Sequence, residues 1–175
     1  RGLKARVPVH ASPFRYCFRL PQGYLGSHGL ERTLPRYDRF FHLLAKPLPP
    51  EWALGAVFYQ IFPDRFRQGR PELAPKEGAW LYGGRPIRKK AWHEPPGEDG
   101  AREFYGGDLF GVLEALPYLE ALGVEALYLT PIFQSPSSHR YDTEDYHRVD
   151  PHLGGEEALR ALYEALEARG MKLIL

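Results

Sequence analysis

A dense cluster of ionisable and aromatic side chains occupies residues 138–151, SHRYDTEDYHRVDP. This stretch contains four carboxylates, two histidines, two arginines and two tyrosines. Paired carboxylates can act as a nucleophile and a general acid, and histidine can transfer protons near neutral pH. The same residue types can also hold a ligand, because imidazoles bond hydroxyl groups and a tyrosine ring offers a flat apolar face. The composition of the stretch therefore allows either bond cleavage or binding.

The carboxylates of this stretch are Asp142, Glu144, Asp145 and Asp150. Acidic residues in a loop after a strand commonly accept hydrogen bonds from backbone N–H groups, cap turns or pair with arginines. We expect such structural roles for all four rather than catalysis. The neighbouring histidines show no spacing that is typical of metal ligands.

The elements around this stretch predict a parallel α/β sheet. Apolar runs at 55–62, 124–130 and 171–175 are typical of buried strands, and 108–123 and 154–170 have the apolar spacing of helices. The order strand, helix, strand, helix, strand implies right-handed crossovers. In such folds, ligands meet the loops at the carboxyl ends of the strands. Residues 138–146 follow the second strand, and the long loop 63–107 follows the first, so both fall on the expected functional face.

The two predicted helices have defined ends and faces. Asp108 is expected to cap the first helix, and Pro117 to kink or split it. In the second helix, one face carries Leu159, Leu162, Tyr163 and Leu166. We expect both helices to pack on the sheet through these apolar faces.

Residues 1–49 predict β structure that is separate from the α/β part. FRYCFRL (14–20) and RFFHLLA (39–45) are candidate strands, because apolar and polar residues alternate in the first and apolar residues dominate the second. The proline-rich stretch KPLPPEW (46–52) reads as a linker. We therefore predict a domain boundary near residue 50.

Composition limits the classes of partner. The 175 residues carry a formal net charge of +1, so we expect neither nucleic acid nor a membrane as a partner. A single cysteine, Cys17, excludes an internal disulfide and favours a reducing compartment, so we predict a cytoplasmic protein. The absence of asparagine favours a thermophilic source, although GC-rich coding would give the same bias.

Four stretches carry a likeness to a known family: AVFYQIFPDRF (56–66), FYGGDLFGVLEALPYLEALGV (104–124), EALYLTPIF (125–133) and SHRYDTEDYHRVDPHLGG (138–155). Together they resemble the α-amylase superfamily, glycoside hydrolase family thirteen. The likeness is greatest to the neopullulanase, cyclomaltodextrinase and maltogenic amylase group. It implies a (β/α)8 barrel in which 50–175 supplies strands one to three and the first two helices, after the end of a β-sandwich starch-binding module at 1–49. The chain thus resembles an N-terminal fragment.

The resemblance implies a retaining glycosidase acting on α-1,4 bonds of cyclodextrins, pullulan or maltooligosaccharides, with α-1,6 bonds as a wider alternative. Such enzymes use two carboxyl groups about 5–5.5 Å apart. In this family the catalytic acids follow strands four, five and seven, which this sequence does not contain. We therefore predict no catalytic residue in the chain and no activity for the chain by itself.

Three residues are predicted to bind substrate by their match to the family. Tyr141 matches a tyrosine whose ring stacks on the sugar at the cleavage position, where a flat aromatic face suits a pyranose. His139 matches a histidine that contacts the same sugar, and Asp142 is expected to organise the loop. Trp80, in the long loop, either anchors that loop or lines an outer subsite.

The family resemblance suggests bound calcium, but the residues of this sequence do not support it. The neopullulanase group commonly holds Ca²⁺ through Asn-Gly-Asp and Asn-Asp after its PDRF stretch, together with a later Gly-Gly-Asp. Here the corresponding positions are Gln68, Arg70, Leu73 and Ala74, so most oxygen ligands are missing. We predict no calcium, and we predict that the Arg70 guanidinium takes the place of the ion beside Asp108.

Other functions compete with this interpretation. An exo-acting α-glucosidase usually has Asp three residues before the stacking tyrosine, where this chain has Ser138. A non-catalytic carbohydrate-binding protein is a second alternative. A nucleotide-binding sheet is disfavoured, because no P-loop and no GxGxxG follows the first strand. The family also implies a homodimer of the intact protein.

Overall fold

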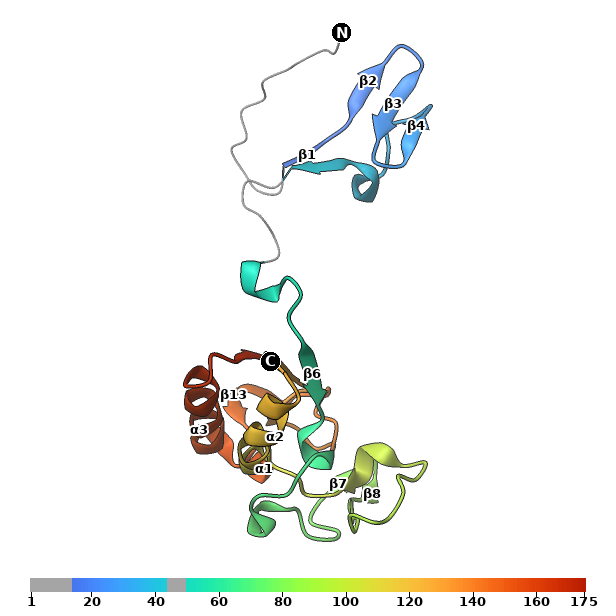
Figure 1. Ribbon diagram of the computed structural model, residues 1–175. Helices are drawn as coiled ribbons and strands as arrows, with labels where there is room; N and C mark the ends of the chain where they lie inside the picture. The colour runs from blue at the N-terminus through green and yellow to red at the C-terminus, as the bar shows by residue number, and fades with distance from the viewer. Residues whose placement is uncertain (1–13, 44–49) are drawn as a thin grey trace. The chain divides into compact units, whose positions relative to one another are not determined.

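The computed structural model describes residues 14–43 and 50–175, and the chain divides into two compact units, Arg1–Gly55 and Ala56–Leu175 (Figure 1). In the first unit, strand β1 (Phe14–Tyr16) pairs antiparallel with β5 (Phe41–Leu43). A separate antiparallel sheet contains β2 (Phe18–Leu20), β3 (Gly23–Gly26) and β4 (Gly29–Glu31). Short 3-10 turns are η1 (Tyr37–Arg39) and η2 (Glu51–Ala53).

The first unit divides the predicted strand 14–20 at Cys17, because the two halves pair with different strands. Residues 44–45 of the second predicted strand and 46–49 of the predicted linker lie outside the described residues. The assignment of 1–49 to the end of a starch-binding module stays a prediction.

A three-stranded parallel sheet organises the second unit. Its strands are β6 (Phe58–Ile61), β11 (Ala126–Leu129) and β14 (Lys172–Ile174), in the order β14-β11-β6. Ala126 aligns with Phe58 on one side and with Lys172 on the other. All three predicted strands are present and parallel, so the α/β class is confirmed.

Three helices pack on one face of this sheet through a shared apolar core (Figure 1). Helices α1 (Leu109–Glu114) and α2 (Leu116–Ala121) join at Ala115, two residues before Pro117, so the predicted split is present. Helix α3 (Gly155–Glu167) buries Ala158, Leu162 and Leu166. The prediction for Tyr163 was wrong: this side chain is exposed on α3, because the buried stripe follows Ala158, Leu162 and Leu166 at four-residue intervals.

The long loop 63–107 contains short elements rather than one structureless span. They are η3 (Pro63–Arg65), η4 (Pro71–Leu73), the hairpin β7 (Leu81–Tyr82) and β8 (Arg85–Pro86), β9 (Arg88–Lys89), η5 (Gly100–Arg102) and β10 (Glu103–Phe104). The two ends of the loop lie together, because the Gly107 N–H donates to the Asp64 carbonyl at 2.8 Å. A Cβ at Gly107 would lie 2.1 Å from the Pro63 carbonyl oxygen, so only glycine fits this crossing.

A hairpin that the sequence did not predict follows β11. Strand β12 (Phe133–Gln134) pairs antiparallel with β13 (Asp145–Val149), and η6 (Pro151–Leu153) leads into α3. The hairpin places residues 135–144 between two paired strands. The chemistry-bearing stretch is therefore held at both ends by backbone hydrogen bonds.

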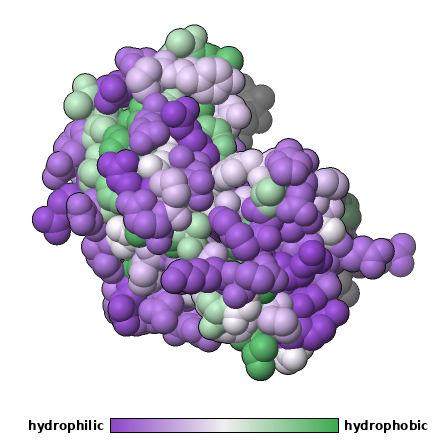
Figure 2. All heavy atoms as spheres, turned by 90° about the horizontal axis from the view of Figure 1, so that it is seen from below, coloured by the Kyte–Doolittle hydropathy of each residue, from purple (hydrophilic) through white to green (hydrophobic). Residues whose placement is uncertain are grey.

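One face of the molecule shows how polar and apolar side chains are distributed at the surface. The face drawn in Figure 2 is mostly hydrophilic, with apolar side chains in small separate patches. Among residues 14–43 and 50–175, no helix is long and apolar enough to cross a membrane.

Candidate functional site

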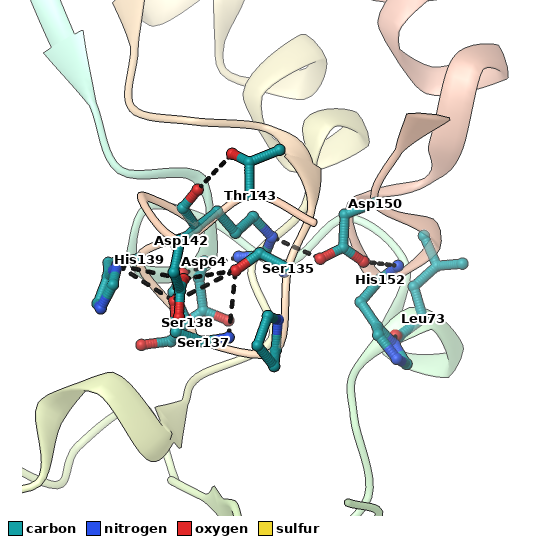
Figure 3. Close-up of polar contacts among 12 residues, drawn as sticks. Asp64, Leu73, Ser135, Ser137, Ser138, His139, Asp142, Thr143, Asp150 and His152 are labelled. Atoms are coloured by element: carbon teal, nitrogen blue, oxygen red, sulfur yellow. Dashed lines mark hydrogen bonds and ion pairs between the residues drawn. The ribbon is translucent and has the colours of Figure 1, made fainter. Parts of the chain in front are cut away.

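Asp142 is the hydrogen-bonding centre of the loop between β12 and β13. Its Oδ1 accepts the hydroxyl of Ser135 at 2.7 Å and also that of Ser137, and Tyr82 from the long loop donates to the same carboxylate. Figure 3 shows Asp142 beside Ser135, Ser137 and His139. Partial burial opposes ionisation, but the donors Ser137, Ser135 and Tyr82 outweigh it and hold the pKa of Asp142 below its ordinary value. Asp142 is thus an ionised acceptor of hydroxyl groups from two loops and is unsuited to act as a general acid.

His139 and Tyr141 lie side by side near this centre, with His139 partly buried and Tyr141 exposed. The Nδ1 atom of His139 accepts the backbone N–H of Tyr141 at 3.1 Å, which assigns the proton of the neutral ring to Nε2. Nε2–H therefore remains able to donate to a ligand. The two rings lie 5.9 Å apart between centroids, and Tyr141 is 63% exposed. A flat aromatic face and a hydrogen-bond donor are thus adjacent at the surface.

The predicted site residues come together, but the three other acidic residues of the stretch do not join them. Asp150 is buried and accepts the Arg140 Nε–H at 2.6 Å and the His152 N–H at 2.8 Å. Asp145 accepts the N–H of His147 at 2.8 Å. Both have the structural roles that loop carboxylates were expected to have. Glu144 is exposed.

Asp64, which lies near this loop, has a raised pKa. Burial raises the pKa of Asp64, although backbone hydrogen bonds and nearby arginines act in the other direction. Its oxygens accept the N–H groups of Tyr105 at 2.9 Å and Gly106 at 3.1 Å, and the residue is 1% exposed. A general acid must reach its substrate, so Asp64 is a buried structural group that joins both ends of the long loop.

The long loop is anchored against the hairpin by Trp80. Its indole N–H donates to the Pro136 carbonyl at 2.8 Å, and its ring stacks on His152 at 5.2 Å between centroids. Of the two roles considered for Trp80, these contacts support anchoring.

Residues 60–175 match the family described as "Alpha amylase, catalytic domain". The chain belongs to this family. It is 41% identical over 161 residues to the intracellular maltogenic amylase of Bacillus subtilis, covering 87% of this chain and 25% of that protein. It is 42% identical over 171 residues to neopullulanase 2 of Thermoactinomyces vulgaris, covering 92% of this chain and 27% of that protein. The chain therefore spans about a quarter of the length of these relatives.

Solved structures give the same family. The type III pullulan hydrolase of Thermococcus kodakarensis matches with a TM-score of 0.65 and 34% identity, over 86% of this chain and 28% of that chain. Cyclic α-maltosyl-(1→6)-maltose hydrolase of Arthrobacter globiformis, in complex with cyclic α-maltosyl-(1→6)-maltose, matches with a TM-score of 0.62 and 40% identity, over 72% and 25% of the two chains. The recognition made from the four sequence stretches is confirmed.

In this α-amylase family chain, Asp108 is held by backbone groups. Its Oδ1 accepts the Gly111 N–H at 2.7 Å and caps α1, as predicted. Its Oδ2 accepts the N–H groups of Gly69 at 3.0 Å and Arg70 at 2.8 Å. The predicted pairing of the Arg70 guanidinium with Asp108 was wrong: Nη1 lies 3.6 Å from a Glu114 oxygen, and within the described residues no ion pair joins Arg70 to Asp108. The half-exposed side chain of Arg70 instead lies over the Phe110 ring, 5.0 Å from its centroid.

Side-chain N–H groups donate to the carbonyl oxygens of the turn before Asp108, so these oxygens already have hydrogen-bond partners from the protein. The amide of Gln68 donates to the Gly106 carbonyl at 3.1 Å, and the Lys89 ammonium donates to the Tyr105 carbonyl at 2.8 Å. Burial lowers the pKa of Lys89, while the charge of Asp64 acts in the other direction. Calcium takes six to eight oxygen ligands, so this donor set does not fit the ion. Within the described part of the chain, no three His, Cys, Asp or Glu side chains gather as metal ligands would.

Sequence reasoning missed four contributors to this site. Ser135 and Ser137 stand five to seven positions before Asp142, and this short spacing was a signal that could have found them. Tyr82 donates from 60 residues away, which no local pattern indicates. Arg140 was passed over because a charged residue in a polar loop is usually solvated, whereas this one is buried.

Proposed function

We propose that this chain forms a substrate-binding part of a glycoside hydrolase that cleaves α-glucans. The observation that carries the proposal is the exposed Tyr141 ring beside the His139 Nε2–H, on a loop fixed by Asp142, in an α-amylase family chain. The ring would stack on the apolar face of a glucose unit, and the imidazole would donate to one of its hydroxyls.

The substrates we propose are α-1,4-linked cyclodextrins, pullulan and maltooligosaccharides, with α-1,6 bonds as an extension. The names of the relatives support this range, since they include a neopullulanase, a cyclomaltodextrinase and a pullulan hydrolase. The intact protein would form strands one to three of an eight-stranded barrel from 50–175, and would hydrolyse or transfer glycosyl units by a retaining mechanism.

We further propose that the 175-residue chain alone does not cleave glucans. A retaining enzyme needs an accessible acid with a raised pKa and a nearby carboxylate nucleophile. Asp142 has a lowered pKa, Asp64 is buried, and Asp150 is paired with Arg140. The cleaving acids would therefore belong to other segments of the protein.

An exo-acting α-glucosidase remains the less favoured alternative. The Ser138 hydroxyl donates to the Gly100 carbonyl at 2.8 Å, and the residue is buried. This position is thus used to join two loops rather than to grip the end of a glucan.

We propose no calcium requirement, because donors occupy the carbonyls and the carboxylate at the turn before Asp108. A cytoplasmic location is supported by the relative named intracellular. Dimerisation, and the absence of nucleic acid as a partner, stay predictions.

The test is substitution of Tyr141 in the intact protein, with kcat/KM measured on β-cyclodextrin and maltotriose. Tyr141→Ala removes the stacking face and is expected to lower kcat/KM at least about tenfold, which corresponds to about 1.4 kcal/mol. Tyr141→Phe keeps the ring and should stay within about threefold of the parent protein. Tyr118→Ala, at a 60% exposed tyrosine on α2, is the matched control. Equal activity of the Tyr141→Ala and Tyr118→Ala proteins would exclude the stacking role.

A further inference from the structure

Arg140 is buried and adopts a backbone conformation that side-chain-bearing residues rarely take. It is 1% exposed, and its φ of 60° lies in the left-handed region. Among the described residues it is the one non-glycine residue with positive φ. Such a conformation persists only where the surroundings impose it. The contacts of Arg140 must therefore supply the constraint.

The guanidinium group binds two fixed acceptors. Nε–H donates to Asp150 Oδ2 at 2.6 Å, and Nη1–H donates to the Ser138 carbonyl at 2.8 Å. Asp150 is anchored in turn, because its other oxygen accepts the His152 N–H at 2.8 Å and its own N–H donates to Ile132 at 2.9 Å. Figure 3 shows Asp150 between the binding loop and His152. The ion pair thus ties the loop to the rigid junction of β13 and η6.

The backbone of Arg140 is held from both sides as well. Its N–H donates to the Ser137 hydroxyl at 3.1 Å, and its carbonyl accepts the Thr143 hydroxyl at 3.0 Å. These bonds close a tight turn whose neighbouring residues are His139 and Tyr141. The side chain of Arg140 points into the protein while that of Tyr141 is exposed, so the turn directs the two in opposite ways.

We propose that Arg140 is a positioning residue: its buried pair with Asp150 maintains the left-handed turn that presents Tyr141 and His139 to a glucose ring. The identity of the ligand, a glucose ring, rests on the proposed function. The role of Arg140 in holding the turn rests on the geometry alone. A buried guanidinium that served only to stabilise the fold would act equally whether or not Tyr141 carried a ring. A positioning group acts through Tyr141, so its effect depends on that ring.

A double-mutant cycle in the intact protein separates these two roles. The variants are Arg140→Met, Tyr141→Ala and the double substitution, and Arg148→Met at an exposed arginine of the same hairpin is the matched control. Arg140→Met is expected to lower kcat/KM on β-cyclodextrin roughly 10- to 100-fold, since misplacement of a binding group by about 1 Å costs up to that much. In the Tyr141→Ala background the same change should add less than about threefold. Equal losses in both backgrounds would overturn the proposal.

Arg140→Lys serves the same cycle if the methionine variant does not fold. A lysine keeps a cation for Asp150, but its single ammonium group cannot reproduce the fork that also reaches Ser138. Its loss should be smaller than that of the methionine variant and should again shrink when Tyr141 is absent. A loss that is unchanged by the Tyr141 substitution would contradict the positioning role.

A crystal structure of the Arg140 variant tests, independently of activity, whether Arg140 maintains the conformation of the turn. We expect φ at residue 140 to leave the left-handed region and the rings at 139 and 141 to move. An unchanged loop would overturn the proposal even if activity fell. If instead the parent protein does not cleave glucans, or Tyr141→Ala is fully active, the proposed function fails, while a displaced loop would still support the positioning role of Arg140.

Discussion

Replacing Asp142 with alanine tests the hydrogen-bonding centre of the binding loop. The substitution removes the acceptor of two buried hydroxyls, those of Ser135 and Ser137. It also removes the acceptor of the Tyr82 hydroxyl, which lies nearer the surface. Ser137 is fully buried and Ser135 is 7% exposed, so water cannot readily replace the lost carboxylate. Each buried hydroxyl left without its partner costs about 1–3 kcal/mol.

Two hydroxyls without any acceptor would cost about 2–6 kcal/mol, which is an upper bound because the Ser135 and Ser137 hydroxyls lie 3.3 Å apart and that of Ser137 also lies 3.1 Å from His139 Nδ1. This is a large share of the roughly 5–15 kcal/mol that stabilises a typical protein. We give Tyr82 no separate weight, because a contact at the surface is screened by water. Asp142→Asn keeps one oxygen acceptor and should lose about 1–2 kcal/mol, since a bond to a neutral acceptor is about half as strong.

The assay is urea or thermal unfolding of the intact protein, monitored together with kcat/KM on β-cyclodextrin. Asp145→Ala is the control, because that carboxylate accepts one N–H, from His147 two residues away. Asp142→Ala should be clearly less stable than the control and should lose activity as the loop loosens. A destabilisation below about 1 kcal/mol, or one equal to that of Asp145→Ala, would refute the reasoning.

The same residue predicts a pH dependence with a defined sign. Because the folded pKa of Asp142 is lowered, the unfolded chain binds more protons in the window between the two pKa values. The stabilisation is therefore complete above the unfolded value of about 3.9, and is lost as the pH falls through the folded value. Asp142→Asn should flatten the decline of stability below about pH 4. The expected change is modest, since the carboxylate is 34% exposed.

Two further predictions concern the turn before α1. Asp108→Ala removes the acceptor of three backbone N–H groups, those of Gly111, Gly69 and Arg70, and should destabilise the intact protein by about 3–6 kcal/mol in urea unfolding. A loss of about 1 kcal/mol would mean that only the helix cap matters. Adding Ca²⁺ or EDTA should leave Tm unchanged, whereas Lys89→Met should lower stability by about 1–2 kcal/mol by removing the donor to the Tyr105 carbonyl. A rise of Tm with Ca²⁺ would show that the ion binds despite the donor set.

Local sequence signals predicted the parts of the fold that depend on neighbours in the chain. Pro117 predicted the break between α1 and α2, and Asp108 predicted the cap on α1, because both act within one helical turn. Tyr163 was placed on the buried face because helical spacing alone cannot tell that the smaller Ala158 fills that stripe. Which residues of α3 are buried depends on contacts with α1 and the sheet, and the sequence of one helix does not contain this information.

The site shows the same limit. Tyr141, His139 and Asp142 were predicted by their match to one family stretch, SHRYDTEDY, which can be recognised without the fold. The role of Arg70 was mistaken because charge complementarity suggested a side-chain contact, whereas its backbone N–H reaches Asp108 38 residues away. The partners that fix the loop, Tyr82 and Asp150, come from other segments, so only the folded chain brings them to it.

The most direct measurement compares the intact protein with the 175-residue chain on β-cyclodextrin, by release of reducing sugar. We propose that the chain supplies an aromatic face that binds glucose, and that the acids that cleave the bond lie in other segments of the protein. We expect rapid release by the intact protein and none by the chain alone. Sugar release by the isolated chain would contradict this division of binding and cleavage, and inactivity of the intact protein on every α-glucan would contradict the proposed function.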